Sequence, residues 1–590
     1  MDNNIKNISN YTHLHLEDLI DVQNLSQKFN KTKYIKSLYK KKISINLSSD
    51  FTTSFLAEML PLFLANKKIY SKIYEANFGS LNFLIRDLNN NFWKKPECDF
   101  FLLMPSSKKL TYLPKITDNY QTIKSNAKKE ANIWIKTWKS TNKNIIQSLF
   151  DPLPYSNFGN MDGVKIGGIL HYVRLVNSML IKMKPSNVDL IDIENLLIKN
   201  EHLKWNDDKI YNLTKQPFSM NTIPYLSSQI SHIISGVSGF SKKVLVLDLD
   251  NTIWGGIIGD DGIKNIKLGD DTPEGEAFVN FQSYLKSLSN KGIILCVCSK
   301  NNHNTAMEVF LKHKDMKLKK DDITIFMANF GDKASNIKKI SQSLNLNLDS
   351  FVFVDDSNVE CSLVKNKLPE VMVINLSNKD PSDFVNILES SAPFYFNKIT
   401  SEDINRKKSY KNLAIINTKL SENSNIESFL KNLQPQIDIK SVNKENCERM
   451  SQLIGKTNQF KLNSNFYSSK QLLGNKVQSL SISFKDKFHN YGIISALVYS
   501  VSKKDRYLEI NNWVMSCRVF SRRIENYIVA YLIKLMKKNK LDIIKLKFEK
   551  TKKNLYFQIF INNFNTKIKK SGIFKTNIKK IKNDKKHYMN

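Results

Sequence analysis

The chain has 590 residues, a hydrophobic fraction of 41%, and 89 Lys and Arg against 55 Asp and Glu, which gives a net charge of +34. This length predicts several domains, because single hydrophobic cores stop growing beyond about 250–300 residues, and the apolar content excludes a disordered chain. No run of about 18 apolar residues, no secretory pattern in the first residues and no zinc or disulfide spacing among the cysteines is present, so we expect a cytoplasmic protein without a membrane partner.

The positive charge allows two interpretations. A nucleic-acid-binding surface is one of them, since basic domains neutralise phosphates. The excess is mostly Lys, however, and Lys occurs together with Asn and Ile, as in "KKNLYFQIFINNFNTKIKK" over residues 552–570. An AT-rich genome enriches these three residues together, and Arg, which reads guanine edges, is sparse. We therefore do not expect nucleic acid as a partner, although a basic surface favours an acidic protein partner.

Residues 1–240 have the pattern of an α/β region. A polar lead of about 35 residues, for which we expect loose order, precedes a strand at 43–51 and a helix at 52–67. Further apolar runs predict strands at 98–106 and 187–197.

Residues 241–400 have the clearest pattern. Apolar runs at 242–250, 292–299, 322–329 and 350–357 predict strands, and amphipathic segments at 276–292, 304–314 and 333–345 predict the helices between them. Strands that alternate with helices indicate a parallel, doubly wound sheet. Ligands of such sheets bind beyond the carboxyl ends of the strands.

Residues 410–590 change to an α+β pattern. Alternating segments at 480–486, 492–501 and 507–516 predict antiparallel strands, followed by a helix at 522–540 and strands at 542–551 and 555–562. The Lys-rich tail from about residue 567 predicts fraying.

Polar side chains gather where the strands of the central segment end. They are Asp248, Asp250 and Thr252 after the first strand, Cys298, Ser299 and Lys300 at the end of the second, Lys333 at the start of a helix, and Asp355 and Asp356 after the last. Carboxylates are the ligands that Mg²⁺ prefers, and Mg²⁺ offsets the repulsion between a phosphate and an attacking carboxylate. The pattern therefore predicts phosphate chemistry, with Asp250 as general acid and base and with Thr252, Ser299, Lys300 and Lys333 binding phosphate.

The order "DLDNT", "CS", an isolated Lys and "VDD" resembles the haloacid dehalogenase (HAD) superfamily of phosphotransferases. The longer strings "VLDLDNTIWGGIIGDDG", "TPEGEAF", "CVCSKNN", "DKASNI" and "VFVDDSNVE" resemble the FkbH-like subgroup. The resemblance implies an enzyme that removes phosphate from 1,3-bisphosphoglycerate and loads the glyceryl group onto an acyl carrier protein, in a polyketide or secondary-metabolite pathway.

The resemblance also assigns roles to residues. It makes Asp248 the nucleophile, Asp250 the acid and base, Ser299 and Lys333 the phosphate-holding residues, and Asp355 and Asp356 the acidic metal pair. We predict Asp248, Asp250, Asp355 and Asp356 as the Mg²⁺ site, and which residue of the last pair touches the metal stays open.

Acyl transfer needs a second nucleophile, and a thiolate suits it. Cys298 lies beside Ser299 at the predicted strand end, where Lys300 is positioned to lower its pKa. We therefore predict that Cys298 accepts the acyl group on the enzyme. The open alternative is that Cys298 serves only as a small hydrophobic residue of the strand.

The outer segments resemble known modules as well. The first is similar to the SGNH-hydrolase-like region that precedes such HAD domains, with Ser48 and Ser49 at the expected serine position. The glycine expected there and an Asp-x-x-His motif are missing, so we expect a scaffold or carrier-docking role. The last is similar to acetyltransferases of the GNAT type, but Ser521 and Arg523 stand where small residues are usual. Arg518, Arg522 and Arg523 are candidates to hold a phosphate.

The sequence thus predicts a multidomain α/β enzyme with an α/β region at 1–240, a HAD-like catalytic domain at 241–400 and a GNAT-like domain at 410–590. Its expected cofactor is Mg²⁺, and its expected partners are a small phosphorylated metabolite and an acyl carrier protein. Two rivals stay open: a plain phosphatase of a sugar or organic-acid phosphate, and a basic nucleic-acid-binding protein.

Overall fold

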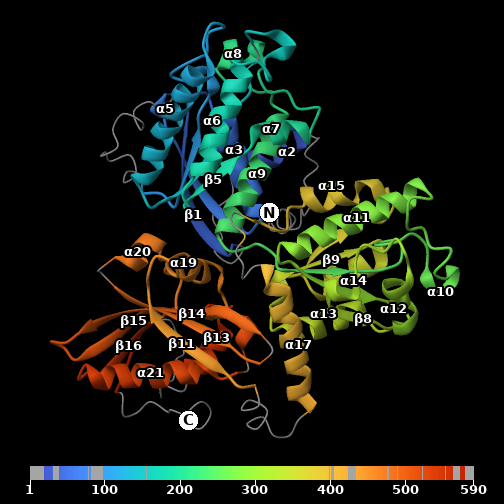
Figure 1. Ribbon diagram of the computed structural model, residues 1–590, viewed down its shortest axis with the longest axis vertical. Coiled ribbons are helices and arrows are strands. Elements are labelled where there is room, and N and C mark those ends of the chain that lie inside the picture. Colours follow the sequence, from blue (N-terminus) through green and yellow to red (C-terminus); the bar gives the residue numbers. More distant parts are fainter. Residues whose placement is uncertain are drawn as a thin grey trace. The chain divides into compact units, whose positions relative to one another are not determined.

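The computed structural model (Figure 1) describes residues 19–30, 39–77, 79–81, 97–153, 156–396, 399, 404–422, 433–474, 477–487, 489–520, 522–551, 553–561 and 572–577. The chain divides into two compact units, Met1–Phe240 and Ser241–Asn590. The residues described here form three separate sheets, one in the first unit and two in the second. Among the described residues, no helix has both the length and the apolar character that a membrane span requires.

The first unit contains a five-stranded parallel sheet in the order β2-β1-β3-β4-β5. Its strands are β1 (Lys41–Ser49), β2 (Ile69–Glu75), β3 (Phe100–Met104), β4 (Asn144–Ser148) and β5 (Val188–Ile191). Its helices are α2 (Leu19–Asn30), α3 (Ser54–Asn66), α5 (Tyr120–Lys139), α6 (Ile169–Met183), α7 (Ile193–Ile198), α8 (Asp208–Thr214) and α9 (Thr222–Val237). Helix α5 buries Ile123, Ala127, Trp134 and Trp138, whose spacing of four or seven residues makes one apolar face against the sheet.

The first sheet of the second unit is also parallel, in the order β10-β9-β6-β7-β8. Its strands are β6 (Val244–Leu247), β7 (Ile294–Ser299), β8 (Ile323–Ala328), β9 (Phe351–Asp355) and β10 (Met372–Asn375). Its helices are α10 (Ile258–Asp261), α11 (Pro273–Asn290), α12 (His303–Lys312), α13 (Lys333–Leu344), α14 (Asn358–Lys367), α15 (Phe384–Ser390) and α17 (Arg406–Glu422). This is the doubly wound sheet that the sequence predicts, with a central strand, β6, that pairs with β9 and β7.

Successive residues of β6 point to opposite faces of this sheet, and each face has its own core. Leu245 and Leu247 pack with residues of α11, α12 and α15, whereas Val244 and Val246 pack with residues of α13, α14 and α17. Because both faces are covered, the strands are apolar throughout, and polar residues come only where the strands end.

The second sheet of this unit is mostly antiparallel, in the order β11-β13-β14-β15-β16-β17, with β12 paired to β15. Its strands are β11 (Gln436–Ser441), β12 (Phe460–Lys461), β13 (Gln478–Lys485), β14 (Asn490–Ser502), β15 (Tyr507–Met515), β16 (Ile543–Phe548) and β17 (Gly572–Asn577). Its helices are α19 (Cys447–Lys456), α20 (Ser469–Leu473), α21 (Ile524–Lys538) and α22 (Leu555–Ile561). Helix α21 runs along the sheet (Figure 1) and buries Ile524, Ile528, Leu532 and Met536 in its core.

These sheets confirm the predicted fold class, a multidomain α/β chain that ends in an α+β part. The exact domain boundaries stay predictions. Three predicted elements differ from the structure. First, residues 19–30 of the polar lead form helix α2, whose Val22, Ser26 and Phe29 are buried. Second, the predicted strand at 187–197 is divided between β5 and α7. The Lys-rich tail lies mostly outside the described residues, apart from β17.

The third difference is the segment 555–562, for which we predicted a strand. It forms helix α22, and Phe557, Phe560 and Ile561 are buried while Ile559 is 63% exposed. Burial at intervals of three and four residues follows the helical period. The segment is apolar at nearly every position, so its sequence pattern did not distinguish the two periods.

Two substitutions in this segment separate the helix from a strand. Phe557→Ala should lower the free energy of unfolding by about 3–5 kcal/mol, because the ring is fully buried against Phe460 and Phe548. Ile559→Ala, the matched control, should change it by less than about 0.5 kcal/mol. Urea unfolding of both variants is the measurement. Equal losses would instead indicate a strand, since residues 557 and 559 would then share a face.

Candidate functional site

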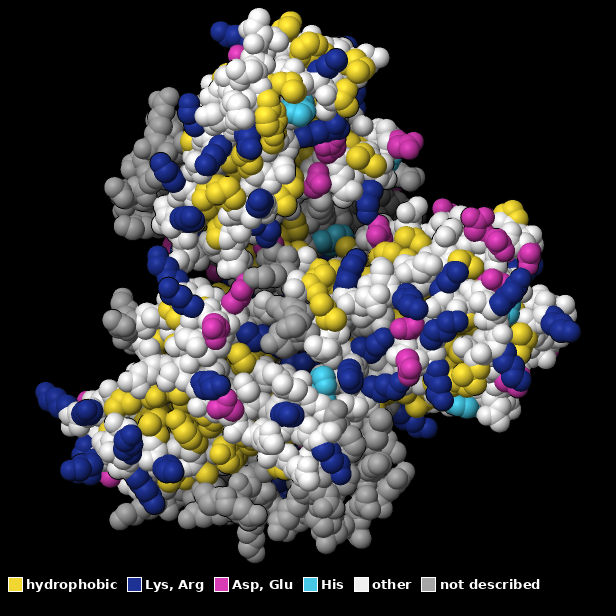
Figure 2. All heavy atoms as spheres, viewed as in Figure 1, with side chains coloured by type: hydrophobic (Ala, Val, Ile, Leu, Met, Phe, Trp, Pro, Cys, Tyr) yellow, Lys and Arg dark blue, Asp and Glu magenta, His cyan; other side chains and the backbone are white. Residues whose placement is uncertain are grey.

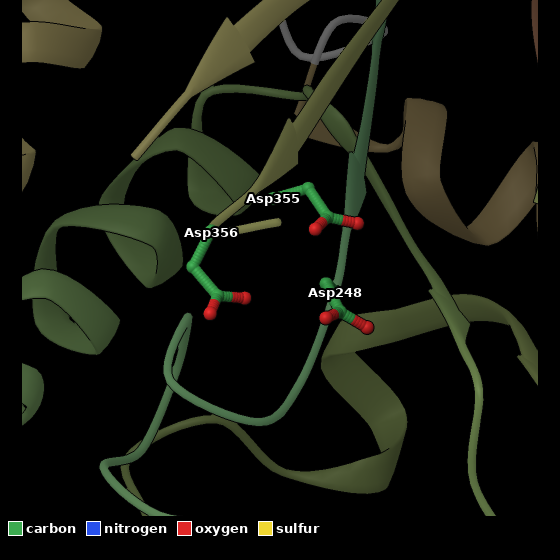
Figure 3. Close-up of side chains that lie close together, drawn as sticks. All are labelled: Asp248, Asp355 and Asp356. Carbon is green, nitrogen blue, oxygen red and sulfur yellow. The ribbon is translucent and has the colours of Figure 1, made fainter. Parts of the chain in front are cut away.

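The carboxyl ends of β6 and β9 bring three acidic side chains together. The two strands are parallel neighbours, and the backbone N–H of Asp248 donates to the carbonyl of Val354 over 3.0 Å. Asp248 therefore lies beside Asp355 and Asp356, which end and follow β9. One carboxylate oxygen from each of the three lies within 4.8 Å of the others, and Figure 3 shows the three side chains close together. We call these three residues the acidic cluster.

Lys333 is the cation that faces the acidic cluster. It is the first residue of α13, whose N-cap is Asp332, and its side chain is buried. Its Nζ lies 3.1 Å from Oδ1 of Asp248 and 2.6 Å from Oδ2 of Asp355. Burial opposes the charged form, but the two carboxylates outweigh it and raise the pKa of Lys333.

The acidic cluster carries more negative charge than Lys333 balances. Burial and then the charge of Asp248 raise the pKa of Asp355 to about 7, and burial also raises the pKa values of Asp248 and Asp356. Three carboxylates and one ammonium leave a net negative charge, which a divalent cation would offset. Hard oxygen donors of this number are the ligands that Mg²⁺ takes in proteins, so Asp248, Asp355 and Asp356 fit a magnesium site.

Two of the predicted phosphate-binding hydroxyls lie next to the acidic cluster. The hydroxyl of Thr252 donates to Oδ1 of Asp356 over 3.4 Å. Ser299 ends β7, and its buried hydroxyl lies close enough to Asp248 to lower the pKa of that carboxyl, against the larger effect of burial. Together with Lys333, these groups surround the point where a phosphate would approach Asp248.

The side chain of Asp250 is not part of the acidic cluster, contrary to its predicted place in the metal site. Its Oδ1 accepts hydrogen bonds from Nε1 of Trp254 at 2.9 Å and from the backbone N–H of Ile258 at 3.0 Å, and its Oδ2 accepts from Nδ2 of Asn301 at 2.8 Å. Three donors therefore hold the carboxylate in one orientation near the site. This arrangement suits the predicted acid and base role and not a metal ligand.

Cys298 differs most from its prediction. It lies in β7 on the face that α13 covers, with no exposed surface, and its Sγ contacts the backbone carbonyl of Lys333 at 3.7 Å. Burial raises the pKa of its thiol to about 12, against a smaller lowering effect of Lys333. The predicted lowering by Lys300 is wrong, because the Lys300 ammonium lies 2.6 Å from Oε1 of Glu360. Cys298 is thus a core residue in this structure, and Lys300 is half-exposed and paired.

Three neighbours of the site were missed at the level of sequence. Trp254 and Asn301 orient Asp250, and Asn301 also donates to the hydroxyl of Ser299 over 3.1 Å. Trp254 lies within "DLDNTIWGG" and Asn301 within "CVCSKNN". Their closeness in sequence to Asp250 and Ser299 was therefore an available signal. Glu360 belongs to α14, and only the packing of that helix beside β9 brings it to Lys300.

In the first unit, Ser48 and Ser49 are buried and their hydroxyls are used in local structure. Ser48 donates to Oδ1 of Asn46, and Ser49 donates to the carbonyl of Met104 and accepts from the backbone N–H of Phe51. These bonds explain the two serines as structural residues at the end of β1. The neighbouring Asp50 is also buried, where its Oδ2 accepts a hydrogen bond from the backbone N–H of Ser106 at 3.2 Å.

Asp50 makes the stability of the first unit depend on pH. Burial raises its pKa to about 6, from 3.8 in an exposed chain. Because the folded pKa is the higher one, the stabilising contribution is complete below about pH 4 and is lost as the pH rises through about 6. Asp50→Asn should remove this dependence and stabilise the unit by about 1–3 kcal/mol at pH 8. Hydrogen exchange of peptides from β1, measured from pH 4 to 8, tests this, and an unchanged pH profile in the variant would contradict it.

Of the arginines after β15, Arg522 differs from its prediction. Arg522 is fully buried: its Nε lies 3.3 Å from Oδ2 of Asp486, and its other nitrogens donate to the hydroxyl of Tyr491 and the carbonyl of Arg518. It is therefore a core ion pair and not a phosphate ligand. Arg523 precedes α21 in a left-handed conformation, with φ of 54°. Ser521 lies outside the described residues.

The fold and the acidic cluster are those of an enzyme with a HAD-like parallel sheet, and comparisons with known proteins support this class. Residues 44–235 match the family model of the FkbH N-terminal domain. The structure is similar to the N-terminal part of the protein BF1531 from Bacteroides fragilis, which contains a phosphatase domain and was crystallised in complex with Mg. That similarity covers 64% of this chain and 98% of the other, at 28% identity and a TM-score of 0.57.

Two acetyltransferases are similar to smaller parts of the chain. The ribosomal-protein-S18-alanine N-acetyltransferase from Escherichia coli matches over 24% of this chain and 94% of its own, at 10% identity and a TM-score of 0.18. A GNAT-family acetyltransferase from Streptococcus pneumoniae matches over 24% and 99%, at 9% identity and a TM-score of 0.18. Comparison with curated proteins gives no match.

Proposed function

We propose that this protein is a Mg²⁺-dependent enzyme that removes phosphate from a phosphorylated three-carbon acid, such as 1,3-bisphosphoglycerate, and transfers the glyceryl group to an acyl carrier protein. The observation that carries the phosphatase half is the acidic cluster with Lys333 at the carboxyl ends of two parallel strands. The carrier half is supported by the match of residues 44–235 to the FkbH N-terminal domain and by the motifs of the central segment.

In this proposal Asp248, Asp355 and Asp356 hold the metal, which when bound offsets the repulsion between substrate phosphate and carboxylate. Asp248 attacks the phosphorus of the phosphate ester, the bond from phosphorus to the ester oxygen breaks, and that oxygen takes a proton from Asp250. Asp250 then removes a proton from the water that frees the phosphate from Asp248. Lys333 neutralises charge on the phosphoryl oxygens, and Trp254 and Asn301 keep Asp250 oriented.

The carrier half also has an electrostatic argument. Acyl carrier proteins with an acidic surface would be attracted by a chain whose net charge is +34. On the face drawn in Figure 2, Lys and Arg side chains are scattered over all parts and do not gather in one band. This distribution favours a general attraction of an acidic protein over a nucleic-acid groove, and a cytoplasmic location accords with such a partner.

A plain phosphatase is the second candidate, and one observation favours it. The thiol that we had assigned to acyl transfer, Cys298, is buried and has a raised pKa. If no other thiol accepts the acyl group, the acidic cluster alone would only hydrolyse a phosphate ester.

One assay separates the two candidates. The protein is incubated with 1,3-bisphosphoglycerate, Mg²⁺ and a holo-carrier, and the carrier is examined by intact mass while released phosphate is measured. A glyceryl adduct on the carrier together with phosphate release supports the proposal. Phosphate release without the adduct supports the plain phosphatase, and release of phosphate from the ester p-nitrophenyl phosphate that persists in EDTA would contradict both.

A further inference from the structure

The second unit contains a pocket that is separate from the acidic cluster. It has a volume of about 80 Å³, and its lining includes Lys243 and Ser350, which precede β6 and β9. Asp248 and Asp355 lie at the other ends of these same strands. Five residues of extended chain separate Lys243 from Asp248, which corresponds to about 16 Å. The pocket therefore lies at the opposite edge of the sheet from the phosphatase site.

The lining of this pocket is strongly basic. Its cationic side chains are Lys243, Arg406, Arg449, Lys456, Arg518 and Lys553. Of the described residues that line it, Asp349 is the single acid, and it pairs with Lys553 at 2.6 Å. Burial, together with the charges of Arg406 and Lys553, lowers the pKa of Lys243 although Cys517 opposes this. Such an excess of positive charge, with guanidinium groups among it, selects a ligand that carries one or more phosphates.

A thiol also lines the pocket. Cys517 follows β15, and it is the partly exposed cysteine among the described residues, whereas the other five are buried. Its Sγ lies 2.9 Å from the hydroxyl of Tyr410. Burial raises the pKa of Tyr410 well above its usual value, so this hydroxyl stays protonated. It can therefore donate a hydrogen bond to a sulfur that becomes negative.

We propose that Cys517, and not Cys298, is the acyl-accepting nucleophile, and that the basic pocket binds the phosphates of an acyl phosphate substrate. This rests on the proposed function and locates its acyl-transfer half. The sulfur of Cys517 attacks the carbonyl carbon, a C–S bond forms, and the bond from that carbon to the bridging oxygen breaks. Phosphate leaves with the thiol proton, and the products are a thioester on Cys517 and HPO₄²⁻. The thiol of a phosphopantetheine arm then attacks the thioester and releases Cys517 with a proton.

The lining residues have distinct parts in this reaction. The cations hold the leaving phosphate and lower the charge that develops on it. Tyr410 stabilises the thiolate by a hydrogen bond. The distance to the acidic cluster leaves Asp248 to act on a phosphate ester in a separate event, so acyl transfer and ester hydrolysis take place at two sites.

The test uses the full-length protein with 1,3-bisphosphoglycerate and no carrier. Intact mass should show one adduct that hydroxylamine removes, 3-phosphoglyceryl or, after the acidic cluster has removed the ester phosphate, glyceryl, and peptide mapping should place it on Cys517. Cys517→Ala should lose the adduct, and Cys447→Ala, a cysteine of α19 outside the pocket, should keep it. Thermal melting checks that the variants are folded. Arg406→Gln should raise the acyl phosphate concentration for half-maximal labelling by about tenfold.

The outcomes distinguish this inference from the proposed function. An adduct on Cys298, or an adduct that persists in Cys517→Ala, would overturn the assignment to Cys517. Loading of the carrier without any thioester on the enzyme would overturn it as well, while the proposed function would stand. If the wild type forms no thioester and loads no carrier, acyl transfer itself is contradicted, and only the phosphatase half survives.

Discussion

Replacing Asp248 with Asn is expected to lower the rate of Mg²⁺-dependent phosphate release by at least about 10³-fold, the largest effect that we predict on activity. Asp248 is buried between Asp355 and Lys333, so its substitution removes both the attacking oxygen and one metal ligand. The amide has nearly the same shape as the carboxylate but cannot attack phosphorus, so the fold should persist.

Phosphate release from 1,3-bisphosphoglycerate and from p-nitrophenyl phosphate, each at saturating Mg²⁺, measures this effect. The matched control is Asp260→Asn, which changes an exposed carboxylate in α10 and should retain the wild-type rate within about twofold. A rate for Asp248→Asn within tenfold of the wild type would show that another residue attacks the phosphate.

Lys333→Met should have the second-largest effect, and it should act on stability as well as on activity. The ammonium is buried and contacts two carboxylates, so its removal leaves uncompensated negative charge in the core. Breaking a buried ion pair in this way costs about 3–5 kcal/mol. Phosphate release should fall by about 10²–10³-fold, since the charge that stabilises the transferred phosphoryl group is lost.

Mg²⁺ distinguishes this electrostatic effect from a packing defect. If the lost stability arises from unbalanced carboxylates, Mg²⁺ should restore a large part of it, because a divalent cation bound by the acidic cluster supplies the missing charge. Melting temperatures of the wild type and of Lys333→Met, each in EDTA and in Mg²⁺, measure this. Lys338→Met, a substitution elsewhere in α13, is the control. An equal deficit with and without Mg²⁺ would contradict a metal site at these residues.

The sequence predicted the framework of the parallel sheet of β6 to β10 because the sequence signals for its strands are local. Each apolar run is short and is followed directly by polar residues, and the parallel order places those residues at one edge. Asp248, Asp355, Asp356, Ser299 and Lys333 could therefore be grouped before their distances were known. Their catalytic roles remain predictions, which the variants above address.

What the sequence did not predict depends on side-chain orientation and on packing. Cys298 and Ser299 are adjacent, but alternation along β7 turns Cys298 under α13 and Ser299 toward the acidic cluster. The partner of Lys300, Glu360, lies 60 residues away. Cys517 and Tyr410 are separated by 107 residues, so no local sequence pattern predicts their contact.

Chemical trapping of the phosphorylated enzyme tests most directly whether the acidic cluster carries out the phosphate chemistry. The wild type is mixed with 1,3-bisphosphoglycerate and Mg²⁺, quenched with borohydride, and digested for peptide mass mapping. Reduction of an aspartyl phosphate gives homoserine, which should be found at position 248 and should be absent when EDTA is present. Mg²⁺-dependent phosphate release in the same sample with an unmodified Asp248, or with homoserine at another aspartate, would contradict the site that we describe.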